Sequence, residues 1–359
     1  MKRTTTSAAV LTTALVVAAT TTAAPAPAAD SGGSSGNRVL ATGVGAPFQI
    51  ATRGKTVFYT DGFAGTINKV TNRGPRVVAR VNGVSGIEFT NSGKTMAIAH
   101  GGGGPTPPAR VTLVTRGKAP VVAKVDQYEN TVNPDKNRTY GITTGASPAC
   151  KTELETPQPD SPPPPPATYK GIKDSHPYQL EALRGGAFAL ADAGVNGILR
   201  IGKRGGISLI ALLPPQPIRL STAQAQALGV PSCANETYAF EPVPTDVERA
   251  GGALWVTTLP GGPESPALGA RGSVYKIKRG VVTKVAGGFL GATNLDVVRG
   301  RIYVTEFFSG KVTKLGKGGR FTRYNIPGAV SVEATRKHLY IGSFGSGPSA
   351  PGKVVRLPR

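Results

Sequence analysis

The sequence predicts an all-β fold, a six-bladed β-propeller of four-stranded blades. Three observations support this prediction: one apolar strand pattern recurs six times, each copy stands in a similar unit of short strands, and the N-terminal segment resembles a strand that the last unit lacks. The 359 residues include 48 glycines and 31 prolines. That composition favours many tight turns and few long helices.

The recurring strand is apolar and ends in a polar or small residue before a loop. Its six copies are residues 57–61, 96–100, 188–192, 254–258, 302–306 and 339–343. A short strand and a turn precede each copy, and a third strand, a basic turn and a fourth strand follow. Four strands of about five residues in a unit of about 40 are typical of a propeller blade. Such units must stack on one another, so residues 38–359 are predicted to form a single domain.

Two spacings between successive copies are longer than the others. The last residues of successive copies are 92 residues apart between His100 and Asp192, and 66 residues apart between Asp192 and Thr258. These gaps could accommodate a seventh blade. We interpret segments 126–175 and 214–242 as insertions instead, because they lack alternating apolar strands. The prolines at 162–166 predict an extended conformation without a packed core, and Ser221 and Gly229 predict a short helix between them.

The final unit supplies only three strands, the last at residues 353–357. Segment 38–42 resembles the fourth strand of the first unit, residues 76–79. We therefore expect the N-terminal strand to pair with the last blade and close the ring, since closure leaves no open sheet edge.

The first 28 residues have the features of a secretory signal peptide. Lys2 and Arg3 precede an apolar stretch at 8–19, and Ala26-Pro27-Ala28 fits a cleavage site. A membrane anchor is the alternative, but the apolar stretch is shorter than the ~20 residues that span a bilayer. We expect a flexible leader at 29–37 and a secreted, monomeric protein without a transmembrane segment.

The two cysteines lie one in each insertion, at Cys150 and Cys233. Two cysteines in an exported chain favour a disulfide, which would join the two insertions. Two unpaired thiols are the alternative.

Two stretches carry a resemblance to a known family. They are His176-Pro177-Tyr178-Gln179-Leu180 with the strand that follows at 189–193, and Asn294-Leu295-Asp296-Val297 with the strand at 303–306. Over residues 38–357 the chain resembles the ScyD/ScyE family of exported proteins, within the NHL and gluconolactonase-like class of six-bladed β-propellers. The resemblance implies the fold and assigns no reaction, because one fold serves many functions.

Two sets of residues are candidates for a ligand site at the channel mouth. One set ends the recurring strands and comprises Asp61, His100, Asp192 and Glu306; the other lies on the preceding strands and comprises Gln49, Gln179, Asp246 and Asp296. Converging carboxylates can hold Ca²⁺, and Asp246 and Asp296 are the best candidates for this role. The resemblance raises the same idea, because a central metal assists hydrolysis in gluconolactonase-like propellers.

The alternative for the strand-end set is structural. Aspartate at a strand end commonly caps a turn by accepting backbone N–H groups. Thr258 and Ser343 occupy the same position in two units and are poor substitutes for a carboxylate ligand. No catalytic residues are assigned, because the chain has no H-E-x-x-H motif and no G-x-S-x-G nucleophile elbow between a strand and a helix.

The chain has a formal net charge of +22. Basic residues gather near the turns between third and fourth strands: Arg73, Arg116, Lys118, Lys203, Arg204, Lys278, Arg279, Lys317 and Arg320. These turns should lie opposite the insertions, where they would bind an anionic envelope polymer or form a solvated rim. No specific nucleic acid is expected, because aromatic residues make up 6% of the chain and do not alternate with basic ones.

The sequence thus favours a secreted, non-catalytic propeller. It would bind a small molecule or protein at the channel mouth, on the face that carries the insertions. The alternative function is a metal-assisted hydrolase or lactonase that uses the channel carboxylates.

Overall fold

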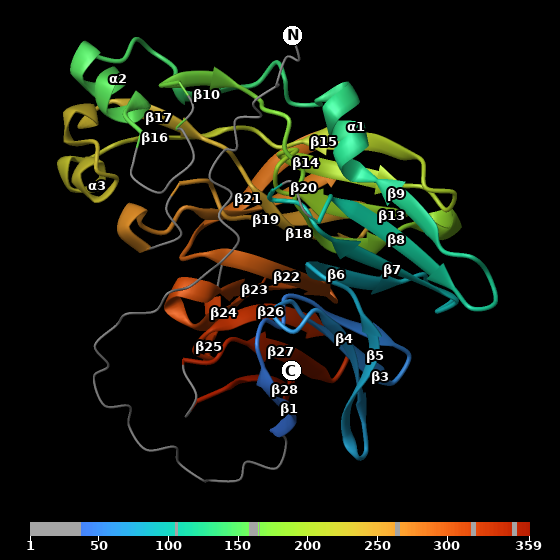
Figure 1. The fold of residues 1–359 in the computed structure, drawn as a ribbon. Coiled ribbons are helices and arrows are strands. Elements are labelled where there is room, and N and C mark those ends of the chain that lie inside the picture. The colour runs from blue at the N-terminus through green and yellow to red at the C-terminus, as the bar shows by residue number, and fades with distance from the viewer. Residues whose placement is uncertain are drawn as a thin grey trace.

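The described residues of the chain fold into seven four-stranded antiparallel sheets (Figure 1). The computed structural model describes residues 37–104, 107–157, 164, 166–262, 266–316, 321–346 and 350–359. The predicted signal peptide, nearly all of the leader, most of the proline run at 162–166, and Lys317 and Arg320 lie outside these ranges.

Five sheets, numbered I to V here, each consist of four strands that are consecutive in the chain. Sheet I contains β2 (Ile50–Arg53), β3 (Thr56–Asp61), β4 (Thr66–Thr71) and β5 (Gly74–Arg80). Sheet II contains β6 (Val84–Phe89), β7 (Thr95–His100), β8 (Arg110–Thr115) and β9 (Val121–Lys124). Sheet III contains β12 (Pro177–Ala182), β13 (Phe188–Asp192), β14 (Gly197–Ile201) and β15 (Ile207–Leu212). Sheet IV contains β18 (Pro244–Ala250), β19 (Ala253–Thr258), β20 (Gly272–Lys278) and β21 (Val281–Phe289). Sheet V contains β22 (Ala292–Val298), β23 (Arg301–Glu306), β24 (Lys311–Leu315) and β25 (Phe321–Asn325).

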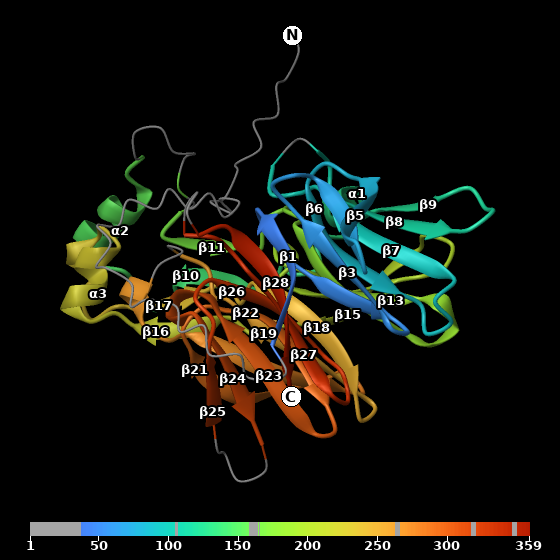
Figure 2. The ribbon, with the colours of Figure 1, turned by 90° about the horizontal axis from the view of Figure 1, so that it is seen from below.

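Sheet VI combines the two ends of the chain. It consists of β26 (Ala329–Ala334), β27 (His338–Ser343), β28 (Gly352–Pro358) and the N-terminal β1 (Arg38–Val44). Strand β1 runs antiparallel to β28 with Arg38 opposite Arg356 and Val44 opposite Gly352, and Figure 2 shows the two strands side by side. The second strand of each of sheets I to VI ends at the residue that the sequence predicts, from Asp61 in β3 to Ser343 in β27.

The core consists of clusters that lie between sheets. Between sheets I and II, for example, Phe58 and Ile67 pack with Ile87 and Ile98. Similar clusters join II to III, III to IV, IV to V and V to VI. One more cluster joins sheet VI to sheet I, where Ala41, Val44 and Val354 pack with Val57 and Tyr59. Each sheet therefore buries both faces against its neighbours, as stacked repeat units must.

The two insertions, which were expected to lack alternating apolar strands, together build the seventh sheet from four short strands. The first contributes β10 (Thr139–Ile142) and β11 (Thr168–Lys170), and the second contributes β16 (Gln216–Arg219) and β17 (Thr237–Phe240). The sheet order is β11-β10-β17-β16, and β10 pairs with β17 across the two insertions. Strands of three or four residues are too short to display an alternating pattern, and their pairing depends on a distant partner.

Helices and a disulfide complete this insertion sheet. The α-helices of the described residues are α1 (Val125–Val132), α2 (Pro148–Glu155) and α3 (Thr222–Ala227). The 3₁₀ turns are η1 (Arg184–Gly186), η2 (Pro231–Cys233), η3 (Pro266–Leu268) and η4 (Phe307–Ser309). Ser221 and Gln224 form a capping box on α3, which confirms the predicted helix start. Cys150 of α2 and Cys233 of η2 form the predicted disulfide.

The insertions also have a core of their own. Ile142, Cys150, Leu220, Ala225 and Phe240 are buried together, and in Figure 1 α2 and α3 lie beside β10, β16 and β17 at one side of the molecule. The described part of the first insertion therefore contributes to a packed core, whereas most of the proline run, for which an extended conformation is predicted, lies outside the described residues. Among the described helices, none has the length and apolar composition needed to cross a bilayer.

Candidate functional site

The strand-end residues lie on the face that carries the insertions. Second strands end on this face, and the insertions enter between the last strand of one sheet and the first strand of the next. Asp61, His100, Asp192 and Glu306 thus share one end of their sheets, as the sequence predicts.

Three of these side chains accept hydrogen bonds from nearby loops. Asp61 accepts from the backbone N–H groups of Gly45 (2.9 Å), Ala46 (3.0 Å) and Ala64 (3.2 Å). The carboxylate therefore fastens the segment before β2 to the end of β3 of the same sheet, as the capping interpretation requires.

Asp192 repeats this arrangement in sheet III. It accepts from Ser175 Oγ at 2.7 Å, from His176 N at 2.8 Å and from Val195 N at 3.2 Å. Burial raises the pKa of Asp192 to about 6, while these hydrogen bonds act in the lowering direction. Glu306 accepts from Leu290 N at 2.9 Å and from Thr313 Oγ1.

His100 differs from the three acids. Its Nε2 lies 2.9 Å from Thr112 Oγ1 of the next strand. Burial, and then the charge of Arg110, lower the pKa of His100. Capping and strand pairing account for the contacts of all four residues; ligand contact by any of them stays a prediction.

The second candidate set lies on the first strands, except for Gln49, which directly precedes β2. The side chains of this set connect neighbouring sheets. Gln49 Oε1 accepts from Ile87 N at 2.7 Å, and Gln49 Nε2 donates to Leu180 O at 3.2 Å. Gln179 Nε2 donates to Phe48 O at 2.6 Å, whereas its Oε1 is buried without a hydrogen bond to the described residues. These contacts join sheets I, II and III at or beside the first strand of each sheet.

The two aspartates act in the same way on the other side. Asp246 accepts from Val247 N at 2.8 Å and from Leu295 N of the next sheet at 2.9 Å. Asp296 accepts from Val297 N and from Ala334 N of the next sheet. Both carboxylates are thereby engaged in holding first strands together, which occupies oxygens that a metal would need.

Strand register separates the candidate set into two rows. Asp246 lies opposite Thr257, and its counterpart in sheet V is Asn294, opposite Thr305. Asp296 lies opposite Tyr303, so its counterpart in sheet IV is Glu248, opposite Trp255. Gln49, Gln179 and Asp246 thus belong to one row, and Asp296 belongs to the next.

Asp296 is part of a row of carboxylates on the first strands that sequence reasoning missed. Its members are Glu88, Glu181, Glu248, Asp296 and Glu333, with Ala51 at the sixth position. An apolar residue precedes each acid in the sequence, and this repeated pair was the available signal. We call these five acids the carboxylate row.

Burial dominates the ionisation of the carboxylate row. It raises the pKa of Glu88, Glu248 and Glu333 well above the usual value, and the charges of other row members add to the rise. It also raises the pKa of Glu181 to about 7, against the lowering effect of Arg249, whose Nε lies 3.5 Å from Glu181 Oε1. The pKa of Asp296 is raised to about 6 by burial. The row is therefore partly protonated at neutral pH.

Phenylalanine side chains gather on the insertion-bearing face, and sequence reasoning missed them too. Phe48 precedes β2, Phe63 follows β3, Phe307 follows β23 and Phe344 follows β27. Phe344 has ring centroids of Phe48, Phe63 and Phe307 at 5.8, 5.7 and 5.4 Å. We call these four residues the phenylalanine cluster; it brings together loops of sheets I, V and VI.

The cluster is partly open to solvent. The Phe63 side chain is 62% exposed, and the other three rings are half-buried. A Cβ atom at Gly62 would lie 2.3 Å from the Phe48 ring, so this position needs glycine for the close approach of the backbone. Three of the phenylalanines follow the predicted strand-end residue by one or two positions, and this was the signal in the sequence.

The described residues contain no group of three His, Cys, Asp or Glu side chains arranged to hold a metal ion. A Ca²⁺ site at Asp246 and Asp296 therefore stays a prediction.

Comparisons with known proteins identify the fold class. No family model and no curated protein match the chain. The PQQ-bound aldose sugar dehydrogenase of Streptomyces coelicolor matches 89% of this chain and 96% of its own, with a TM-score of 0.53 at 11% identity. A putative oxidoreductase (glucose dehydrogenase) of Thermus thermophilus matches 89% and 99%, with a TM-score of 0.51 at 15% identity.

A gluconolactonase of Xanthomonas campestris is also similar, with a TM-score of 0.49 at 11% identity over 90% of this chain and 88% of its own. At such identities the likeness shows the fold alone. The chain has an all-β, propeller-like fold of four-stranded antiparallel sheets.

Proposed function

We propose that the protein is a secreted six-bladed β-propeller that binds a small ligand or a partner protein on its insertion-bearing face. Sheets I to VI would be the blades, and the insertion sheet would stand outside the ring. Two observations support this arrangement: buried clusters follow the order I to VI and return to I, and β1 completes sheet VI. Membership in the ScyD/ScyE family stays a prediction.

The phenylalanine cluster is the observation that carries the binding proposal. Its rings come from sheet I near the N-terminus and from sheets V and VI near the C-terminus, yet they meet at one place with Phe63 largely exposed. Exposed aromatic rings that meet in this way offer a surface for apolar or cyclic groups, which stack on ring faces. The capping carboxylates beneath hold the same loops in position.

Saturation-transfer NMR with a panel of neutral aromatic and cyclic compounds tests this function. We expect hits on the wild-type protein, and a loss of about tenfold or more in affinity when Phe63 and Phe344 are both changed to alanine, since two stacking contacts are removed. Val281→Ser is the control, because Val281 is 64% exposed at the start of β21, at the opposite face. Equal binding by the double variant and the control variant would refute the proposal.

A metal-assisted hydrolase or lactonase is the second candidate, and the carboxylate row is the observation that favours it. Five acids on adjacent first strands are a concentration of oxygen ligands of the kind that Ca²⁺ takes. The bonds of Asp246 and Asp296 to backbone N–H groups weigh against it.

Metal analysis separates the two candidates. After purification without chelator, we expect no stoichiometric Ca²⁺ and no lactone turnover that EDTA abolishes. If the wild-type protein contains stoichiometric Ca²⁺ that is absent from Glu248→Gln, and if its turnover is sensitive to EDTA, the function would be metal-assisted hydrolysis and not ligand binding.

The basic turns support the proposal of a second partner, which would bind on the face opposite the insertions. Arg73, Arg116 and Lys203 are exposed in turns at the end of the sheets opposite the insertions, and Lys278 is exposed at the end of β20 beside such a turn. A cavity of about 500 Å³ near these turns is lined by Lys94, Lys118 and Lys203. Positive charge at such a surface attracts polyanions, so an anionic envelope polymer stays the predicted partner of this face.

A further inference from the structure

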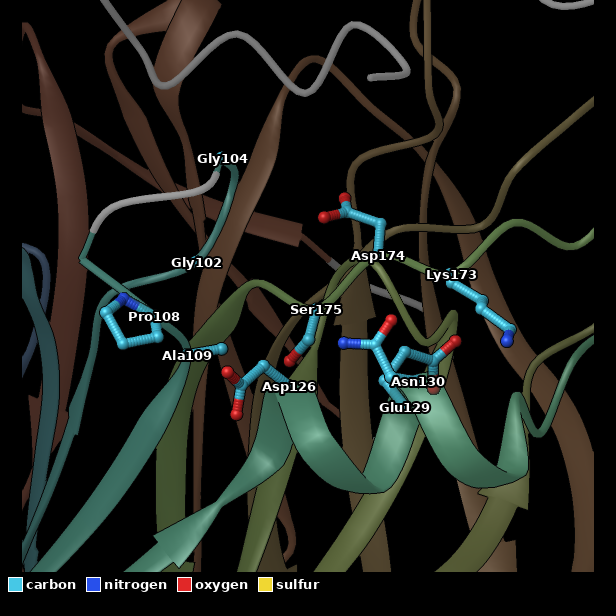
Figure 3. Close-up of a pocket in the computed structure, with 10 residues that line it drawn as sticks. All are labelled: Gly102, Gly104, Pro108, Ala109, Asp126, Glu129, Asn130, Lys173, Asp174 and Ser175. Carbon is cyan, nitrogen blue, oxygen red and sulfur yellow. The ribbon is translucent and has the colours of Figure 1, made fainter. Parts of the chain in front are cut away.

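A cavity of about 190 Å³ lies beside α1, between the loop that follows β7 and the segment that precedes β12. Asp126, Glu129 and Asn130 of α1 line it, together with Lys173 and Asp174 from the segment before β12. Figure 3 shows the helix residues below the cavity and Asp174 above it. The cavity shares no residue with the phenylalanine cluster or the carboxylate row.

Glu129 is the unusual group in this cavity. Its side chain is 1% exposed, and neither carboxyl oxygen has a hydrogen-bond partner among the described residues. Asp126, in contrast, accepts from Arg110 and from Gln127 N. A buried carboxyl without donors is costly, so such a group needs an explanation.

Nearby charges favour the neutral acid when the cavity holds no cation. Burial raises the pKa of Glu129 to about 9, and the charges of Asp192, Asp135 and Asp174 act in the same direction, while Lys173 opposes them. Acidic groups from the segment after α1, from β13 and from the segment before β12 thus act on a carboxyl that has no hydrogen-bond partner among the described residues. A cation in the cavity would reverse this balance, because opposite charge favours the ionised form.

We propose that this cavity binds a small organic cation, whose ammonium or guanidinium N–H groups donate to both oxygens of Glu129. A guanidinium matches two carboxylate oxygens with two parallel N–H donors, and an ammonium supplies three donors. The volume of the cavity has room for several water-sized groups, which suits a small organic molecule.

The side chains favour an organic cation over a metal ion. The cavity-lining acids are not arranged as a metal-binding group within the described part of the chain. Asp126 is already paired with Arg110, whereas neither oxygen of Glu129 has a hydrogen-bond partner among the described residues. A metal would need several oxygens at one point, whereas an organic cation can donate to Glu129 and fill the remaining space.

Binding has a proton balance that can be measured. Neutral Glu129 loses its proton to the solvent, and the carboxylate pairs with the incoming cation, which keeps its own proton. One proton is therefore released for each cation bound at neutral pH.

Calorimetric titration of the purified protein at pH 7 tests the proposal. The probes are N-methylguanidinium chloride and n-butylammonium chloride, each in two buffers of different ionisation enthalpy, with CaCl₂ as a separate arm. We expect at least one organic cation to bind with release of about one proton. Glu129→Gln, which keeps the shape and removes the charge, should weaken binding by about tenfold or more and abolish the release.

Two controls keep the outcomes distinct. Glu155→Gln makes the same chemical change at an exposed residue of α2 and should leave binding and proton release intact. The Phe63→Ala/Phe344→Ala double variant should also bind the cation normally, so failure of the proposed function does not imply failure here. Absence of binding by both organic probes, equal binding by Glu129→Gln, or binding of Ca²⁺ alone would overturn the proposal.

Discussion

Deletion of residues 38–44 should lower the melting temperature by more than about 10 °C. Ala41 and Val44 are buried between sheets VI and I at 4% and 3% exposure, and full burial of an apolar side chain contributes roughly 1.5–3 kcal/mol. The deletion also removes the ladder with β28 and leaves that strand as an open edge. The combined loss approaches the total stability of a typical domain, about 5–15 kcal/mol.

Thermal unfolding followed by circular dichroism measures this effect. Val39→Ser serves as the control within the same strand, because Val39 is 54% exposed and surface changes usually stay within about 0.5 kcal/mol. An unchanged melting temperature after the deletion would contradict a role for β1 in holding sheets VI and I together.

Stability should decrease as the pH rises from 5 to 8. The acids of the carboxylate row have raised pKa values, so the folded state binds more protons than the unfolded state in this range. The stabilisation from these acids is fully present below their pKa in the unfolded state, near 4. It is lost as the pH rises through their pKa in the folded state, about 6 for Asp296 and about 7 for Glu181.

One substitution isolates the contribution of a single row member. Glu181→Gln should reduce the loss of stability between pH 5 and 8 by about 2 kcal/mol, since the amide cannot ionise. Urea unfolding at several pH values measures this, and Glu155→Gln on the exposed face of α2 should leave the pH profile unchanged. Stability that stays flat or increases from pH 5 to 8 would show that the row does not carry buried, protonated carboxyls.

The carboxylate row shows why part of the site escaped sequence reasoning. The sequence displays an apolar residue followed by an acid five times on first strands, but alternation alone does not say which row a residue joins. Asp246 and Asp296 seemed equivalent, yet the ladders place them opposite Thr257 and Tyr303, two positions apart in register. Register depends on strand pairing, and a slip of two residues keeps the same side-chain face.

The sequence alone determined the features that depend on local pattern. Six apolar strands end at the predicted residues, and the capping box starts α3 at the predicted place. The disulfide between Cys150 and Cys233 was also predictable, because the chain has only two cysteines. Strand alternation, turn residues and helix caps act over a few neighbouring residues, so they can be read along the chain.

Only the tertiary structure decided which distant residues meet. It paired β10 with β17 to build a sheet from two insertions and brought Phe63 and Phe344 together from opposite ends of the chain. It also buried Glu129 with no hydrogen-bond partner for its carboxyl among the described residues. These contacts depend on how whole sheets stack, and no local pattern specifies that stacking. The repeated strands therefore predict the propeller-like fold, whereas its binding surfaces result from long-range packing.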